Sequence, residues 1–286
     1  MNGLKRPLAR QPARQATRPL RLAVTSGKGG VGKTTTVANL ALSIANTGLR
    51  TTIVDGDMGL ANLDVLLGLT PQRTLEHFFR NQATLDEIVL SGPRGIRIVP
   101  AGSGLPELTQ LCSAELLQLV EAFDRLQRST DLLIIDTPSG ISDQVSRLIQ
   151  LCDRVLVIAW PEPTALVDAY AALKVIHQRS PQLDAGLLVN GARDATEAER
   201  VHRRIVAAAE KFLGRAIELD GFIVHDGAIN EAARRQRAVV LSHPLSPASR
   251  CFERLALHIA ALARTPTRGV PKESWPDETR AGEIVH

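Results

Sequence analysis

The chain has 286 residues, of which 44% are hydrophobic and 22% are charged. This length is sufficient to bury a large core, and the composition is that of a folded globular protein rather than a disordered or fibrous one. Aromatic residues are scarce, with six Phe, two Trp and one Tyr. A surface that stacks successive bases of a single strand is therefore not expected, and neither is specific binding of nucleic acid.

The excess of positive charge is confined to the start of the chain. Residues 1–21 hold six basic side chains and no acidic one, whereas the remainder has 28 basic and 30 acidic residues. We interpret residues 1–20 as a flexible basic arm, which is a solvated tail or a contact for nucleic acid, anionic lipid or an acidic partner. Residues 265–286, with three prolines among mixed charges, are expected to form a flexible C-terminal tail.

Cysteine spacing and hydropathy indicate the cellular compartment. Cys112, Cys152 and Cys251 are far apart and belong to no CxxC or CxxH pair, so neither a disulfide framework nor a zinc or iron–sulfur site is encoded locally. No apolar run approaches the roughly 18 residues of a membrane span, and the arginine-rich start lacks the apolar region of a signal peptide. We expect a cytoplasmic protein.

Short apolar runs alternate with segments of helical periodicity along the chain. The runs predicted as strands are Leu22–Thr25, Thr52–Val54, Ile96–Val99, Leu132–Ile135, Val155–Ala159, Gly186–Val189 and Phe222–Val224. Helices are predicted between them, for example over Thr34–Asn46 and Glu115–Gln127, where apolar residues form one stripe. This alternation predicts one α/β domain over residues 21–264, with a mainly parallel, doubly wound sheet and helices on both faces.

A glycine-rich loop follows the first predicted strand. Residues 27–34, GKGGVGKT, match the phosphate-loop pattern GxxxxGK[ST]. In such a loop backbone N–H groups surround the phosphates, Lys33 neutralises their charge and Thr34 reaches Mg²⁺. Its position between a strand and an amphipathic helix adds the anion affinity of the helix N-terminus. The sequence therefore predicts a P-loop NTPase.

A dinucleotide-binding site is the alternative interpretation of the same glycines. Gly27, Gly29 and Gly32 also satisfy GxGxxG, and Asp55 closes the next strand at about the distance where such folds place a ribose-binding acid. A nicotinamide-dependent dehydrogenase would fit this pattern. It would leave Lys33 and Thr34 without a γ-phosphate to hold.

Two further loops bring carboxylates to the same predicted sheet edge. Asp136 follows the strand that ends at Ile135, and Gly140 lies four residues beyond it. We expect Asp136 to orient the water shell of Mg²⁺ and the N–H of Gly140 to sense the γ-phosphate. Asp57, after the second strand, is our candidate for positioning the attacking water, because phosphoryl transfer mainly requires alignment and charge compensation.

These motifs together resemble the MinD/ParA ATPases. Residues 28–35, KGGVGKTT, are similar to the deviant Walker A motif of that family. The resemblance implies that Lys28 reaches the phosphates bound by a partner subunit in an ATP-sandwich dimer. It also implies that Asp55–Leu69 and Asp136–Gly140 are the two switch segments and that Asn190 contacts adenine. The implied nucleotide contacts are Gly29, Gly30, Val31, Gly32, Lys33, Thr34, Thr35, Gly140 and Asn190, with ATP and Mg²⁺ as ligands.

Over residues 21–262 the chain resembles one branch of this family more specifically, the MinD-like flagellar-number regulators of the FlhG/FleN type. This resemblance is carried by segments such as EPTALVDAYAALKVI and AARRQRAVVLSHPLSPAS. The resemblance implies a dimerising ATPase switch that acts through a flagellar GTPase of the signal-recognition type or a flagellar transcriptional activator. The alternatives within the family are a ParA-like partitioning ATPase that binds DNA non-specifically and a MinD-type positioning ATPase.

Two features depart from that pattern. Family members usually carry Ile-Pro-Tyr-Asp where this chain has IVHD at 223–226, so we do not expect Asp226 to contact adenine. The stripe Phe252, Leu255, Ile259 and Leu262 lies on the last predicted helix. We expect that helix to dock on the core, with reversible peripheral membrane contact as the alternative.

Overall fold

The computed structural model describes residues 18–59, 61–102 and 113–265. Most of the predicted arm and tail, residues 1–17 and 266–286, lies outside the described residues. The described chain forms one layered α/β structure built on a single eight-stranded sheet.

Every apolar run predicted as a strand overlaps a strand of this sheet. The strands are β1 (Leu20–Thr25), β2 (Thr51–Asp55), β3 (Leu90–Ser91), β4 (Arg97–Val99), β5 (Leu132–Asp136), β6 (Arg154–Ala159), β7 (Asp184–Ala192) and β8 (Glu218–Val224). Their spatial order is β3-β4-β2-β5-β1-β6-β7-β8, and all neighbouring pairs except β3 with β4 are parallel. The sequence analysis missed β3, whose two residues are too few to show alternation before the turn at Pro93–Gly95.

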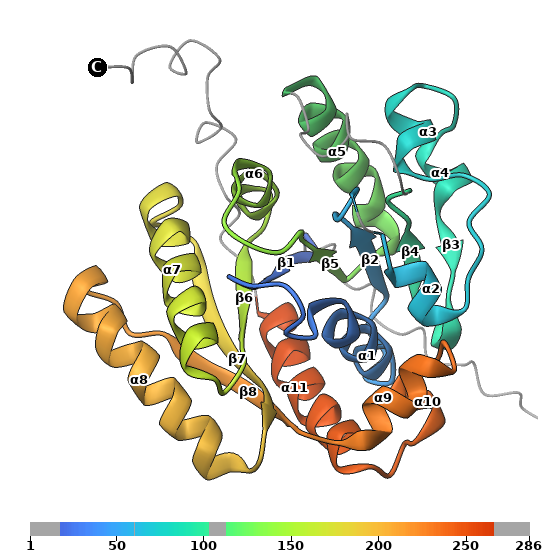
Figure 1. Cartoon of the computed structure of the whole chain (residues 1–286). Helices are drawn as coiled ribbons and strands as arrows, with labels where there is room; N and C mark the ends of the chain where they lie inside the picture. Colours follow the sequence, from blue (N-terminus) through green and yellow to red (C-terminus); the bar gives the residue numbers. More distant parts are fainter. Residues whose placement is uncertain (1–17, 60, 103–112, 266–286) are drawn as a thin grey trace, which may run out of the picture.

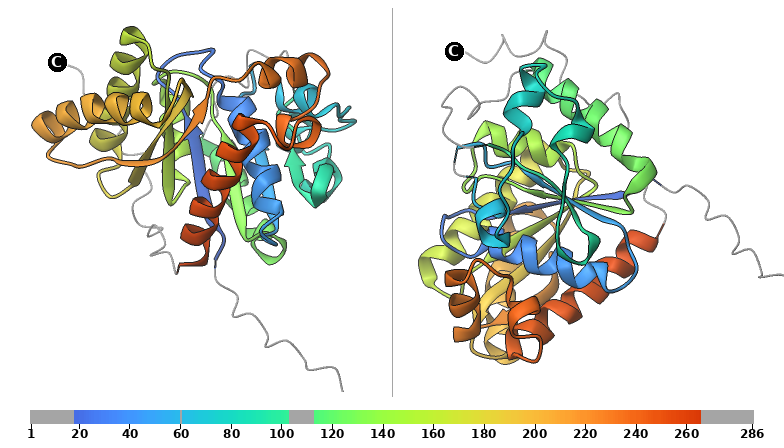
Figure 2. Two further views of the ribbon diagram at one scale, coloured as in Figure 1. Left: turned by 90° about the horizontal axis from the view of Figure 1, so that it is seen from below. Right: turned by 90° about the vertical axis from the view of Figure 1, so that its right-hand side faces the viewer.

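Helices cover both faces of the sheet, as Figures 1 and 2 show. One face carries α1 (Lys33–Ala45), α2 (Leu63–Leu67), α9 (Gly227–Arg234), α10 (Val239–Ser242) and α11 (Pro247–Arg264). The other face carries α3 (Leu75–Phe79), α4 (Leu85–Ile88), α5 (Ser113–Leu126), α6 (Asp143–Gln150), α7 (Pro163–Arg179) and α8 (Ala195–Leu213). Because the central strands are apolar on both sides, two separate cores form, one under each helix layer.

Short polar side chains fix where several helices begin. Ser142, Asp194, Asp226 and Ser246 each precede a helix and accept a hydrogen bond from a backbone N–H of its first turn. Such caps satisfy donors that the helix itself cannot pair. They define the starts of α6, α8, α9 and α11 independently of packing.

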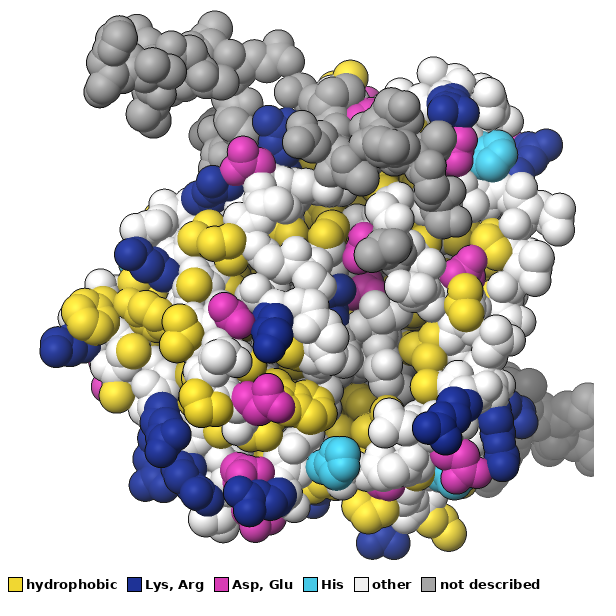
Figure 3. All heavy atoms as spheres, viewed as in Figure 1, with side chains coloured by type: hydrophobic (Ala, Val, Ile, Leu, Met, Phe, Trp, Pro, Cys, Tyr) yellow, Lys and Arg dark blue, Asp and Glu magenta, His cyan; other side chains and the backbone are white. Residues whose placement is uncertain are grey.

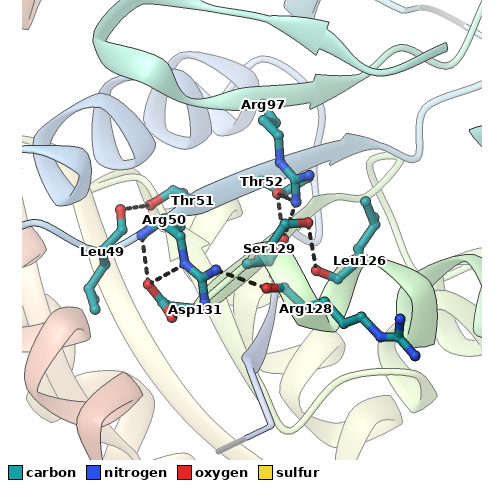
Figure 4. Close-up of polar contacts among 10 residues, drawn as sticks. Leu49, Arg50, Thr51, Thr52, Arg97, Leu126, Arg128, Ser129 and Asp131 are labelled. Atoms are coloured by element: carbon teal, nitrogen blue, oxygen red, sulfur yellow. Dashed lines mark hydrogen bonds and ion pairs between the residues drawn. The ribbon is translucent and has the colours of Figure 1, made fainter. Parts of the chain in front are cut away.

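Arginine side chains tie the amino ends of the strands together. Arg50, just before β2, donates through its backbone N–H and its guanidinium to Asp131, just before β5 (Figure 4). Arg97 at the start of β4 donates to the hydroxyl of Thr52 at 3.1 Å. At the other side of the sheet, Arg154 pairs with the buried Asp220 at 2.6 Å. Side-chain hydrogen bonds and ion pairs thus join neighbouring strands at the amino edge of the sheet. The glycine-rich loop lies at the opposite, carboxyl edge.

The last helix docks on the core, as expected. Phe252, Leu255 and Ile259 of α11 are all at most 2% exposed and belong to the cluster that also contains the inner face of α1. Among the described residues no helix is long and apolar enough to cross a membrane.

Candidate nucleotide-binding site

The glycine-rich loop joins β1 to α1 at the carboxyl edge of the sheet, at the centre of the strand order. Gly30 and Gly32 have φ values of 79° and 84°, a left-handed conformation that only glycine adopts at little cost. Gly32 is also the N-cap of α1. Because glycine has no side chain, no capping hydrogen bond is made to the backbone N–H groups of the first turn of α1. The loop therefore presents unpaired backbone donors at a helix N-terminus, which is an arrangement suited to phosphate.

Lys33 points into its own subunit. Its Nζ lies 3.3 Å from Oδ1 of Asp136 at the end of β5, and both side chains are at most 6% exposed. Lys33 and the hydroxyl of Thr34 both act to lower the pKa of Asp136. The sequence prediction that Asp136 reaches the phosphate loop is thus confirmed geometrically, since β1 and β5 are neighbours in register.

A second buried carboxylate lies beside Asp136. Asp55 ends β2 directly opposite Asp136 in the β2–β5 pairing and is 2% exposed. Burial, followed by the negative charge of Asp136, raises the pKa of Asp55 well above its ordinary value. Burial also raises the pKa of Asp136, although Lys33 and Thr34 oppose that shift. This corner therefore holds two buried acids and one buried lysine.

The donor set at this corner fits a divalent cation. Oδ2 of Asp136 is buried and has no hydrogen-bond partner, and the nearby Thr34 hydroxyl favours the ionised carboxylate by lowering its pKa. Carboxylate and hydroxyl oxygens, together with phosphate oxygens and water, are the ligands that Mg²⁺ prefers. The residues predicted for the metal, Thr34 and Asp136, are therefore together and chemically suitable.

Asp55 does not face the position that a dinucleotide ribose would need. Asp55 is 2% exposed, and its carboxylate accepts the backbone N–H of Asp57 at 3.1 Å. The dinucleotide-binding interpretation required an accessible acid here, because it must bond two ribose hydroxyls. The burial of Asp55 makes that interpretation wrong.

The two predicted switch segments follow β2 and β5, which lie on the same side of β1 in the sheet. Asp57 follows β2 and is half-buried, while the backbone N–H of Gly140 donates to the carbonyl of Ser26 at 2.9 Å. The Ser26 hydroxyl in turn donates to the carbonyl of Lys28 at 2.9 Å. In this state the Gly140 N–H is therefore engaged with the start of the phosphate loop and must leave Ser26 to meet a γ-phosphate.

Asn190 fixes the middle of the loop. Its Nδ2 donates to the buried carbonyl of Val31 at 2.8 Å, and a Cβ on Gly32 would lie 2.4 Å from that Nδ2. The strand predicted over Gly186–Val189 is longer in the structure: β7 continues through Asn190 to Ala192, with a register shift between these two residues. The irregularity was not visible in the sequence because glycine at 191 is a weak signal by itself.

The outer rim of the loop is exposed. The side chain of Lys28 is open to solvent, as are Gly29 and Gly30, whereas Val31 is buried and Thr35 is half-buried. Behind the loop, a Cβ on Gly27 would lie 2.0 Å from the carbonyl oxygen of Asp168. The loop is therefore packed against α7 on one side and open on the other.

Asp226 has a structural role. Its two carboxylate oxygens accept the N–H of Ala228 at 2.9 Å and that of Ala248 at 3.1 Å. Burial opposes ionisation, but the N–H groups of Ala248 and Ala228 outweigh it and lower the pKa of Asp226. This carboxylate ties α9 to α11.

A glycine-rich loop, a buried lysine and two strand-end acids at one edge of a parallel sheet define a P-loop nucleotide-binding protein. The ParA family, described as "NUBPL iron-transfer P-loop NTPase", matches residues 19–260. The chain therefore belongs to the ParA/MinD family of P-loop ATPases.

Relatives of this chain include an antiactivator and a flagellum site-determining protein. The antiactivator FleN of Pseudomonas aeruginosa is 38% identical over 255 residues, which cover 89% of this chain and 86% of that protein. The flagellum site-determining protein YlxH of Helicobacter pylori is 29% identical, covering 88% of this chain and 85% of that protein. The fold matches the septum site-determining protein MinD of Pyrococcus horikoshii in complex with Mg-ADP, with a TM-score of 0.68 and 24% identity over 87% of this chain and 99% of that one.

Sequence reasoning missed several residues that build the site. Ser26 and Gly56 are examples: Ser26 receives the Gly140 N–H, and the Gly56 N–H donates to the Asp136 carbonyl at 2.8 Å. Both contacts join loops that follow different strands, and both use backbone atoms. No side-chain pattern marks such contacts, so only the strand order could reveal them.

Proposed function

We propose that this protein is a Mg-ATP-dependent switch that dimerises with ATP and regulates the number or placement of flagella. The contrast between the two loop lysines carries the proposal. Lys33 is buried on Asp136 of its own chain, whereas Lys28, five residues earlier, is exposed at the rim of the same loop. A cation in that position is free to reach phosphates held by a second copy.

Each residue of the site has a part in this proposal. Lys33 and the backbone of Gly29–Gly32 bind the phosphates, and Thr34 and Asp136, the latter through a water, hold Mg²⁺. When bound, Mg²⁺ would neutralise charge on the phosphate oxygens. Because Lys33 already sits in a charged cradle, nucleotide binding exchanges its carboxylate partner for phosphate rather than burying a new charge.

Hydrolysis would depend on the two switch segments. Asp57, on the loop after β2, would align the attacking water, and Lys28 of the second copy would stabilise charge that develops on the transferred phosphoryl group. Gly140 would leave Ser26 and donate to the γ-phosphate, which makes its loop sensitive to the state of the nucleotide. Asn190 would contact adenine while it supports the loop.

The flagellar part of the proposal rests on the relatives. A protein named antiactivator aligns with 89% of this chain, and one named for determining the flagellar site aligns with 88%. We therefore infer that the ATP-bound form acts on a flagellar transcriptional activator or on a flagellar GTPase of the signal-recognition type. Such partners are cytoplasmic, so the protein would act in the cytoplasm, with peripheral membrane or polar contact as a further arrangement.

The test is the mass of the protein in solution with ADP and with ATP plus Mg²⁺, measured by light scattering after size exclusion. The monomer of 30.9 kDa should double with ATP and not with ADP. Lys28→Ala should stay monomeric, while Lys211→Ala, which removes an exposed lysine on α8, should dimerise normally. Asp57→Ala should dimerise with ATP but lose about 10²-fold or more in turnover.

Two results would contradict the proposal. If the mass in solution is the same with ADP and with ATP, the protein is not a nucleotide-dependent dimerisation switch. If Lys28→Ala still dimerises with ATP, Lys28 does not reach the phosphates of a second copy. The flagellar role has its own readout, the number of flagella per cell after deletion of the gene. A normal number in the deletion strain would remove that role and leave the ATPase intact.

One observation favours a second candidate function. Lys and Arg side chains gather over α8 at the lower left of Figure 3, where Arg200, Arg203 and Arg204 are exposed. A ParA-like protein that binds DNA non-specifically would need such a surface, and its DNA affinity would fall steeply with salt. The test is whether the ATP-bound dimer binds DNA at low salt and whether the double variant Arg203→Glu/Arg204→Glu loses this binding. Both results together would favour a DNA-partitioning function over flagellar control.

A further inference from the structure

Trp160 stands at the carboxyl end of β6, on the face of the sheet that carries α1, and is half-buried against the core under that helix. It is one of two tryptophans in the chain. A large aromatic side chain at this edge does not belong to the phosphate-loop motif or to either switch. Its neighbours indicate what it does.

The indole occupies the space where residue 191 would have a side chain. A Cβ on Gly191 would lie 2.3–2.6 Å from three atoms of the six-membered ring of Trp160. Gly191 has a φ of 77° and lies at the register shift near the end of β7. The ring therefore rests on a left-handed backbone turn that only glycine can form here.

The residue before that turn holds the phosphate loop. Asn190 donates to the Val31 carbonyl at 2.8 Å and fills the space beside Gly32. The direction of the Asn190 side chain depends on the backbone turn that follows it. A change in the position of the indole is thus transmitted through Gly191 and Asn190 to the part of the loop that binds phosphate.

The backbone of Trp160 is itself held firmly. Its carbonyl accepts the N–H of Glu162 at 2.8 Å, and the prolines at 161 and 163 restrict the following turn. α7 begins at Pro163, and one turn later the carbonyl of Asp168 abuts Gly27 at the other end of the loop. Residues 160–168 therefore touch the phosphate loop directly at Gly27, through Asp168, and indirectly through Gly191 and Asn190, next to Trp160.

From these contacts we propose that Trp160 is a positioning residue for nucleotide binding. Its indole fixes the turn at Gly191, which sets Asn190 and, through it, the carbonyl of Val31. The indole does not have to touch the nucleotide. Its fluorescence should nevertheless report whether the loop is occupied, because the ring lies on the backbone next to Asn190.

The test compares Trp160→Ala and Trp160→Phe with the unchanged protein in binding Mg-ADP, measured by calorimetry on the full chain. Trp160→Ala should weaken binding about tenfold, since small misplacements of binding groups are costly. Trp160→Phe keeps a ring on Gly191 and should stay within about threefold of the unchanged protein. Phe78→Ala, which removes a half-buried ring on α3, is the matched control and should bind Mg-ADP normally.

A spectroscopic arm uses Trp275→Phe, which leaves Trp160 as the only tryptophan. Its emission should shift when Mg-ADP saturates the site. An unchanged emission at saturation, unaltered binding in Trp160→Ala, or an equal loss in Phe78→Ala would each overturn the proposal. The emission arm does not depend on the folding of Trp160→Ala. None of these readouts requires dimerisation or a flagellar partner, so they test Trp160 separately from the proposed function.

Discussion

At the scale of single residues, the site is dominated by the balance between Lys33 and two buried acids. Asp136 has Lys33 and Thr34 as partners, whereas Asp55 has backbone N–H groups and the repulsion of Asp136. Ionised Asp55 therefore costs folding free energy until a cation compensates its charge. Proteins often store instability of this kind where they bind a ligand.

Asp55→Asn tests how the buried carboxyl group of Asp55 affects the stability of the protein and its dependence on pH. The pKa of Asp55 is raised on folding, so the folded state binds the proton more tightly than the unfolded chain does. Stability is then lost as pH rises from about 3.8 through the raised pKa. We expect the variant to be more stable than the unchanged protein at pH 7 and to lose part of that pH dependence in urea unfolding measured at several pH values. The exposed Asp86→Asn should change neither, and a destabilised Asp55→Asn would contradict the account.

At the scale of elements, α11 supports the helix that carries the site. It packs along α1 and β8, and its apolar stripe belongs to the same core cluster as the inner face of α1. Lys33 and Thr34 are the first residues of α1, so the position of that helix decides where they point. Docking of α11 is thus linked to the geometry of phosphate binding.

Phe252→Ala should reveal how much this docking contributes. The ring is 1% exposed, and removing a buried Phe side chain typically costs about 3–5 kcal/mol. We expect a loss in that range in chemical denaturation, together with weaker nucleotide binding. Leu257→Ala on the same helix removes a side chain that is 62% exposed and should stay within about 0.5 kcal/mol. A small effect of Phe252→Ala would favour a helix that leaves the core.

At the scale of the whole molecule, the amino edge and the carboxyl edge of the sheet differ in what they carry. Arginine–carboxylate pairs such as Arg50–Asp131 and Arg154–Asp220 close the amino edge. The carboxyl edge carries the phosphate loop, the two segments predicted as switches, and Trp160, which follows the end of β6. Nucleotide bound there contacts loops from several strands and should therefore stabilise the fold as a whole.

Mg-ADP should raise the free energy of unfolding of the entire domain. At a concentration one hundred times its Kd, a ligand that binds only the folded state contributes about 2.7 kcal/mol. We expect a gain of that size in denaturation experiments, and EDTA should remove much of it if Thr34 and Asp136 hold the metal. Lys33→Ala should show little gain. An equal gain with and without EDTA would argue against a metal at this corner.

The fold was largely predictable from the sequence, because its signals are local. The apolar runs, the helical stripes and the loop at 27–34 each depend on residues only a few positions apart, and they were sufficient for the α/β class, the parallel sheet and the phosphate site. The short β3 was missed since two residues carry no pattern. The register shift at Gly191 was missed because a lone glycine has many explanations.

What only the tertiary structure decided is how distant residues pair. Lys33 and Asp136 are 103 positions apart, and Asn190 and Val31 are 159 apart; Trp160 meets Gly191 only because β6 and β7 are neighbours. The burial of Asp55 and the docking of α11 likewise depend on the strand order. The sequence by itself determined the elements and the phosphate loop, because those follow from local patterning and backbone chemistry. The tertiary structure decided which acid holds Lys33 and which ring supports the loop, because packing across the sheet joins residues that no local pattern connects.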